Sequence, residues 1–328
     1  MTSFTPPGPY DTGQLPVVYG SAMPDQFPTG VGFSPVTVAS SENAVLLRVS
    51  GLLLAVAGVL LAIGSMLPVW VVQIGGHEIR SLPWRGDVAG GVTHHSSPSL
   101  GVQLTLLAVI ALGIGVLTLV LAERPYAWSA PVGVATGGLL LGFGITQVGH
   151  VVNNHYSGLH FQYGSGLWLV VLAAIAALFG ALAALSANGE RTMLEGRGPS
   201  DLQAGFGLLA TAAATAVAAV GLHLDGHKGF HGSTTLTSVM TAALLVGLLF
   251  AVALAVLLLL GRADRAGVRP LTALVAAWLL GSTSTLAWPA LFHSQLPTFL
   301  AHSIWGLSAV VLTAAFTMVA AVRATALR

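Results

Sequence analysis

The sequence predicts an all-α integral membrane protein with about eight transmembrane helices. Of its 328 residues, 55% are hydrophobic and only 7% are charged, whereas a soluble domain carries about 25% charged residues. Several apolar runs exceed the roughly 20 residues that a helix needs to cross the hydrocarbon core of a bilayer. A backbone exposed to lipid must satisfy its own hydrogen bonds, which an α-helix does. These observations together predict a multi-pass helical protein of the cell membrane.

The first 43 residues differ from the rest of the chain. They contain seven prolines among glycine, serine, threonine and tyrosine, namely Pro6, Pro7, Pro9, Pro16, Pro24, Pro28 and Pro35. Such a segment buries too little apolar area to offset the entropy of ordering it. We therefore expect residues 1–43 to form a disordered Pro/Gly-rich tail.

Hydropathy places eight spans after this tail. They cover residues 46–72, 100–121, 128–149, 164–186, 203–222, 237–260, 269–288 and 299–321. We expect Pro68 to kink the first span near its end. Four spans fall in each of two membrane halves, 44–186 and 203–322.

The distribution of lysine and arginine predicts the orientation. Nine arginines fall on the side of the two termini: Arg48, Arg124, Arg191, Arg197, Arg262, Arg265, Arg269, Arg323 and Arg328. Arg80, Arg85 and Lys228 fall on the other side. Because cytoplasmic loops are enriched in positive residues, both termini are predicted to be cytoplasmic.

The two halves share short motifs. The segments "ERPYAW" (123–128) and "GVRPLT" (267–272) each place an Arg-Pro step before a span, and proline is tolerated at a helix start. The segments "HFQYGSGLWLVVL" (160–172) and "HSIWGLSAVVL" (302–312) each place histidine, then tryptophan, before an apolar run. Because each half has an even number of spans, a duplication would give two parallel four-helix repeats. The alternative is two unrelated helical bundles that acquired the same residue preferences at the membrane–water interface independently.

The eleven histidines all map to the outer side or to outer helix ends. Two clusters have regular spacing, and with Asp225 they form the candidate metal site: His150, His155, His160, His223, Asp225, His227 and His231. Because the chain has no cysteine, metal ligands are limited to histidine and carboxylates. Imidazole and carboxylate ligands suit Zn²⁺ or Cu²⁺, and clustered histidines also charge as pH falls toward about 6. The alternative is a solvated polar loop.

The sequence favours a non-catalytic function. It has no nucleophile–base pair, no phosphate-cradling loop and no ionisable residue clearly inside a span, and its net charge of +1 gives no reason to expect a nucleic-acid partner. We therefore predict an accessory or scaffold subunit of a cell-envelope complex, in contact with membrane proteins or with further copies of itself. The alternative is a carrier of a small apolar molecule. The most polar stretches within spans are residues 281–289 together with Gln103 and Gln147.

Two resemblances bear on this prediction. Eight spans in two halves with histidines at outer helix ends resemble haem A synthases in outline. The second span, however, contains no histidine and no Glu-x-x-His pair, so haem binding is a minor alternative. In composition, the chain resembles Ala- and Gly-rich polytopic membrane proteins of actinobacteria that carry a Pro/Gly-rich cytoplasmic leader, a resemblance that implies no activity.

Overall fold

The computed structural model describes residues 41–89, 92–95, 99–123, 129–153, 160–188, 199–226, 238–261, 268–292 and 297–326. Residues 1–40 of the predicted tail lie outside these ranges. The helices of the described chain are α1 (Ser41–Gly64), α2 (Ser99–Leu121), α3 (Ser129–Asn153), α4 (Ser165–Asn188), α5 (Pro199–Gly226), α6 (Ser238–Leu259), α7 (Val268–Phe292) and α8 (Pro297–Ala326). The predicted helical fold is thus confirmed.

Six of these helices are long and apolar enough to cross a membrane, namely α1 to α6. In α8, the described residues include a shorter apolar stretch, Ser308–Arg323. The six apolar helices are consistent with a multi-pass membrane protein. Whether the number of spans is eight stays a prediction.

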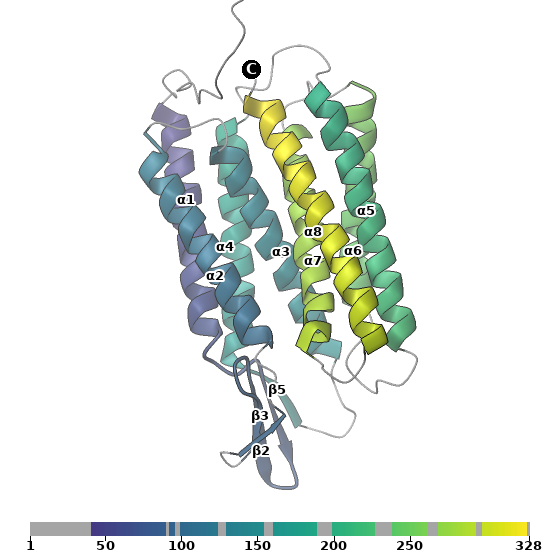
Figure 1. Cartoon of the computed structure of the whole chain (residues 1–328). Coiled ribbons are helices and arrows are strands. Elements are labelled where there is room, and N and C mark those ends of the chain that lie inside the picture. Colours follow the sequence, from purple (N-terminus) through teal and green to yellow (C-terminus); the bar gives the residue numbers. More distant parts are fainter. Residues whose placement is uncertain are drawn as a thin grey trace, which may run out of the picture. The chain divides into compact units, whose positions relative to one another are not determined.

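Helices α3 and α7 lie at the centre of the bundle (Figure 1). Their mutual contact is the most extensive between any two described helices. In α3, 72% of the span is buried by other parts of the chain, against 33–44% in the other five apolar helices. Its mean hydropathy is also the lowest of the six. A helix surrounded by other helices meets little lipid, so it needs fewer apolar side chains.

The outer helices pack around this central pair. Helix α1 packs against α2 and α4, and α5 packs against α6 and α8. Glycines allow the close approaches: a Cβ atom at Gly51 would lie 2.8 Å from the carbonyl oxygen of Gly115, and one at Gly58 would lie 2.7 Å from the backbone nitrogen of Leu112. Small residues at such contacts are typical of helices that associate inside membranes.

A five-stranded antiparallel sheet extends from one end of the bundle, below called the sheet end (Figure 1). Its strands are β1 (Trp70–Ile74), β2 (His77–Leu82), β3 (Gly86–Ala89), β4 (Val92–His95) and β5 (His160–Tyr163), in the order β4-β3-β2-β1-β5. The first four strands connect α1 to α2, and β5 precedes α4. The sequence does not predict this sheet.

The first predicted span, 46–72, is therefore wrong at its end. Helix α1 ends at Gly64, and Trp70 already belongs to β1. Pro68 follows the helix and does not kink it. The apolar residues after Pro68 include three β-branched valines, which suit a strand, but hydropathy does not distinguish a buried strand from the last turn of a helix. At the other end of β1, Gly75 and Gly76 have φ values of 58° and 82°, as a tight two-residue hairpin requires.

Backbone hydrogen bonds attach the sheet and its flanking segments to the starts of α2 and α4. The Gly101 N–H at the start of α2 donates to Pro83 O at 2.9 Å, and the Gly166 N–H at the start of α4 donates to Pro68 O at 2.9 Å. The Gly164 N–H donates to Val69 O at 2.8 Å. A Cβ atom at Gly164 would fall on the carbonyl oxygen of Pro68, so only glycine allows the segment after α1 to lie this close to α4. These contacts hold the sheet directly against the helix ends.

Candidate functional site

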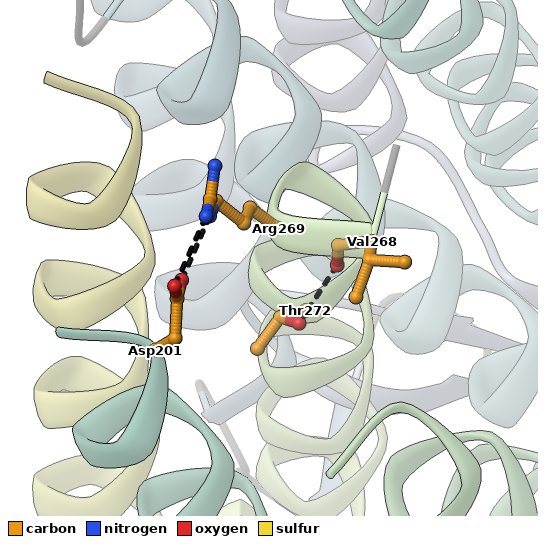
Figure 2. A network of polar contacts seen from close by, with 4 residues as sticks. All are labelled: Asp201, Val268, Arg269 and Thr272. Carbon is orange, nitrogen blue, oxygen red and sulfur yellow. Dashed lines mark hydrogen bonds and ion pairs between the residues drawn. The ribbon is translucent and has the colours of Figure 1, made fainter. Parts of the chain in front are cut away.

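A buried ion pair lies at the end of the bundle opposite the sheet, below called the far end. Arg269, the second residue of α7, donates from Nε to Asp201 Oδ1 at 2.7 Å and from Nη2 to Oδ2 at 3.0 Å. Figure 2 shows the guanidinium of Arg269 extending from α7 toward the carboxylate of Asp201 on α5. The two side chains are 4% and 1% exposed. The pair is thus both bidentate and desolvated, the geometry in which an arginine–carboxylate contact is strongest.

The predicted fifth span, 203–222, leaves Asp201 just outside, whereas the apolar span of α5 begins at Ser200. Asp201 falls within the apolar span Ser200–Val220. Its place in the first turn of α5 suits a carboxylate, because the helix dipole favours negative charge there. Burying a charged group away from water costs free energy unless a group of opposite charge pairs with it. Arg269 and Asp201 are therefore tolerated in the bundle because they pair.

In the next turn of α7, a buried hydroxyl group finds its hydrogen-bond acceptor within the same helix. The Thr272 hydroxyl, which is fully buried, donates to Val268 O at 2.8 Å, one turn back along the helix (Figure 2). Threonines in the other central helix do the same, for example Thr146 to Gly142 O at 2.7 Å. Such bonds let a hydroxyl lie inside an apolar bundle without a partner on another helix.

The far end of the first half is built differently. A small apolar cluster of Leu47, Ala122, Ala130 and Ala187 lies there. At this end Arg48 pairs with Glu123 at 2.6 Å, and the pair is exposed, with 50% and 77% of the two side chains accessible. A pair so exposed contributes little to stability. The two halves therefore differ in whether charge is buried at their far ends.

The sheet carries a polar face. In the register of the strands, Gln73 lies opposite Glu78, and Val71 lies opposite both Arg80 and Gln162. Side chains in register share a face, as do alternate residues of one strand, so Gln73, Glu78, Arg80 and Gln162 share one face, and all four are exposed. The Arg80 Nε donates to Glu78 Oε1 at 2.6 Å. This hydrogen bond, together with the charge of Arg80, lowers the pKa of the Glu78 carboxyl, and it raises the pKa of Arg80.

Polar side chains also join the two halves inside the bundle. Gln103 Nε2 on α2 donates to Ser284 Oγ on α7 at 3.2 Å. The Ser282 hydroxyl on α7 donates to Gly142 O on α3 at 3.3 Å. These residues belong to the most polar in-span stretches that the sequence indicates. Each bond links one half to the other, which suits a structural role between the halves.

The predicted metal site falls largely outside what the structure describes. His155, His227 and His231 lie outside the described residues. His150 is in α3, His160 in β5, and His223 and Asp225 are in α5, but their side chains are not among those described. Among the side chains that are described, no group of three or more metal-ligating residues lies together. The metal site thus stays a prediction.

Local signals in the sequence point to each member of the buried pair separately. An aspartate just after "GPS" is typical of a helix start, and an arginine just before Pro270 is typical of another. That the two starts lie side by side depends on the tertiary packing of α5 against α7, which neither local signal contains. Comparison with known proteins found no family model, no curated protein and no solved structure that matches the chain.

Proposed function

We propose that this chain is a non-catalytic scaffold or accessory subunit of a cell-envelope complex, with both termini in the cytoplasm and the sheet outside the membrane. In this orientation the exposed polar face of the sheet, formed by Gln73, Glu78, Arg80 and Gln162, meets the extracytoplasmic parts of other proteins. The observation that carries the proposal is the attachment of the sheet: backbone hydrogen bonds join it to the starts of α2 and α4, and β1 follows α1 after five residues. A surface held in one orientation loses little entropy when a partner binds.

Charge reversal on the sheet tests this role. The variant Glu78→Lys/Gln162→Glu alters the polar face, and Glu123→Lys reverses an exposed charge at the far end as a matched control. After gentle solubilisation and mass spectrometry, we expect a stoichiometric protein partner with the wild type and with the control, and its loss with the sheet variant. A lone, monodisperse protein with bound lipid would instead support the alternative, a carrier of a small apolar molecule.

We also propose that the chain has eight spans arranged as two parallel four-helix repeats. Helices α3 and α7 both have 25 residues, and Pro131 and Pro270 are the third residue of each. A Cβ atom at Gly142 would fall on the carbonyl oxygen of Trp278, and one at Gly281 would fall on that of Leu139. Gly281 lies 139 residues after Gly142, and Trp278 lies 139 residues after Leu139. The two contacts are therefore the same contact seen from each side, which supports a twofold axis between α3 and α7.

A second contact supports the same relation. A Cβ atom at Gly180 on α4 would lie 3.3 Å from Leu54 Cγ and 3.4 Å from Ser50 O on α1. Thr317 on α8 lies 137 residues after Gly180. It contacts Thr211 on α5, with 3.2 Å between the hydroxyl oxygens, and the position of Gly207.

The residues of α5 in this contact correspond to the residues of α1 in the α1–α4 contact at a constant offset in the sequence. Gly207 and Thr211 lie 157 residues after Ser50 and Leu54. One contact between α1 and α4 thus corresponds to one contact between α5 and α8, which supports the proposed repeat. In this alignment Pro270 corresponds to Pro131 and not to Pro125. The Arg-Pro steps at residues 124–125 and 269–270 are therefore not equivalent positions of the repeat.

The predicted extracytoplasmic histidine site belongs to this proposal as a metal-binding or pH-sensing surface. Elemental analysis of protein purified without a His-tag tests it, with the triple variant His223→Ala/His227→Ala/His231→Ala as the comparison. We expect stoichiometric Zn²⁺ or Cu²⁺ in the wild type and less in the variant. Equal metal in both proteins would rule out these three residues as ligands, and a Soret absorption band would favour the haem alternative.

A further inference from the structure

We propose that the turn between β2 and β3 is a membrane-surface anchor: the Trp84 ring lies in the headgroup layer of the bilayer, and the Arg85 guanidinium binds the phosphate of an anionic phospholipid. The anchor requires only that the helices cross a membrane. It is independent of the side on which the sheet lies and of the protein that the polar face of the sheet meets.

The turn is held against the start of α2. The Arg85 N–H donates to Leu82 O at 3.1 Å, which closes the turn, and the Gly101 N–H donates to Pro83 O at 2.9 Å. A Cβ atom at Gly101 would lie 2.6 Å from Cδ2, 2.7 Å from Cγ and 2.9 Å from Cε2 of Trp84. The indole of Trp84 therefore lies directly against the backbone at this helix start.

This contact fixes the height of Trp84 relative to the membrane. The apolar span of α2 is Leu100–Leu121, so Gly101 is its second residue and lies at the boundary of the hydrocarbon core. Although one side of its ring is packed, Trp84 is 39% exposed. An indole combines an apolar ring with an N–H donor, and tryptophan is enriched where a membrane meets water. We therefore expect the exposed side of the Trp84 ring to lie among lipid headgroups.

Two other large side chains are exposed at the same height. Trp168, in the first turn of α4, is 57% exposed, and Met66, two residues after α1, is 68% exposed. Val69 after α1, Leu100 in α2 and Leu167 in α4 pack in one apolar cluster, which shows that these helix ends lie at one level. The exposed apolar surface of the bundle thus continues at this level onto the turn.

Arg85 supplies a charge for the headgroups. It is exposed, and no ion pair joins it to a residue whose side chain the structure describes, whereas the exposed Arg80 is already paired with Glu78. Neighbouring Cα atoms are about 3.8 Å apart and the headgroup layer is about 5–7 Å thick on each side, so Arg85 lies in the same layer as Trp84. A guanidinium binds phosphate through paired hydrogen bonds, and phosphate is the group that phospholipids present there.

Native mass spectrometry of the full chain in detergent, with phosphatidylglycerol or phosphatidylcholine added at equal concentration, tests the lipid site. We expect the wild type to retain several-fold more phosphatidylglycerol than phosphatidylcholine, and Arg85→Gln to lose this preference. Arg80→Gln is the matched control and should keep it, because Glu78 already engages Arg80. Equal lipid retention by the wild type and Arg85→Gln would overturn the site. So would displacement of the lipid by millimolar inorganic phosphate, which would identify free phosphate as the ligand.

A spin label at the turn tests its depth in vesicles of the same two lipids. Because the chain has no cysteine, Trp84→Cys and His77→Cys each carry a single label. His77 is the control, since it is exposed at the tip of the β1–β2 hairpin, the end away from α1. We expect the label at position 84 to be several-fold less accessible to a water-soluble relaxation agent than the label at position 77. Equal accessibility at the two positions would rule out the anchor.

Discussion

Gly142 and Gly281, together with Gly138, are positions of the central contact that leave no space for a methyl group. At each, a Cβ atom would fall on a backbone carbonyl oxygen of the facing helix, and a backbone cannot move aside as the end of a side chain can. We expect Gly142→Ala or Gly281→Ala to reduce the free energy of unfolding by about 1–3 kcal/mol, the usual cost of overpacking. Thermal unfolding in detergent measures the loss.

Gly113 on α2 is the matched control, because a Cβ atom there would meet nothing within 4 Å. Gly113→Ala should leave the stability unchanged or raise it, since alanine is the better helix former. If Gly113→Ala destabilised the protein as much as Gly142→Ala, the effect would come from glycine in membrane helices generally and not from the α3–α7 contact.

The Glu78 carboxyl gives a prediction about pH. Its pKa lies below the ordinary value of 4.5 because Arg80 donates a hydrogen bond to it and adds a favourable charge. Because the pKa of Glu78 is lower in the folded state than in the unfolded state, its contact with Arg80 stabilises the sheet fully at pH values above the unfolded-state pKa. This contribution is lost as the pH falls through the lowered, folded-state pKa. NMR titration of the carboxyl carbon should show the low value.

Arg80→Gln removes both causes, so the Glu78 pKa should return toward 4.5 in that variant. An unchanged Glu78 titration in Arg80→Gln would mean that a group other than Arg80 lowers the pKa of Glu78. Glu78 is exposed on the sheet, so the titration is expected to leave the helices unaffected.

Individual residues were predictable from the sequence to different degrees. Gln103 and residues 281–289 stand out as polar within spans, and the structure joins Gln103 to Ser284. Arg269 was expected only as a charge on the cytoplasmic side, at the start of the span 269–288, and Asp201 was not among the predicted site residues. Both residues are near helix starts, where charges normally face water, and they are buried only because α5 packs against α7 in the folded bundle, where α8 also contacts both helices. A pattern along one chain does not contain that contact.

Among the elements, the sheet depends most on a single position. Gly164 connects β5 to α4, donates to Val69 O at 2.8 Å, and has no space for a side chain beside Pro68. We expect Gly164→Ala to loosen the sheet from the bundle while the helices persist. Hydrogen exchange should then rise in β1 and β5 and stay unchanged in α5 to α8. Equal protection in both proteins would contradict this role for Gly164.

The buried ion pair between α5 and α7 gives a second prediction at this scale. Asp201→Ala should cost about 3–5 kcal/mol, because it leaves Arg269 buried without its partner. Asp201→Leu/Arg269→Met replaces both charges by apolar side chains and should recover most of the loss. The free energies of unfolding of the three proteins measure this difference. A single variant as stable as the double variant would mean that water reaches Arg269.

The helices were the elements that the sequence predicted best, because apolar runs of this length, in a chain with so little charge, are typical of helices that cross a membrane. The sheet could not be predicted in the same way. Its strands are four to six residues long, and β5 is separated from the other four by two helices. Its pairing with β1 is a non-local contact.

For the whole molecule, the orientation in the membrane is the prediction on which the proposed function depends. Reporter fusions in the loop 187–202 should read cytoplasmic, and fusions in 223–235 should read external, because arginine is concentrated on the side of the termini. A cytoplasmic reading in the second loop would contradict the orientation, and with it the extracytoplasmic position of the histidines.

The way in which the sheet is attached has a mechanical consequence. Backbone hydrogen bonds from Gly101, Gly164 and Gly166 hold it to the starts of α2 and α4 and to the segment after α1. A sheet held at three points cannot swing on one of them, so a sideways pull on it becomes a torque on all three helices at once. Those helices pack mainly against one another and against α3, and the contacts of α2 and α4 with α7 are small. Tension applied to the sheet would therefore tilt one half of the bundle against the other, and the glycine-lined contact between α3 and α7 is the place where that strain would collect.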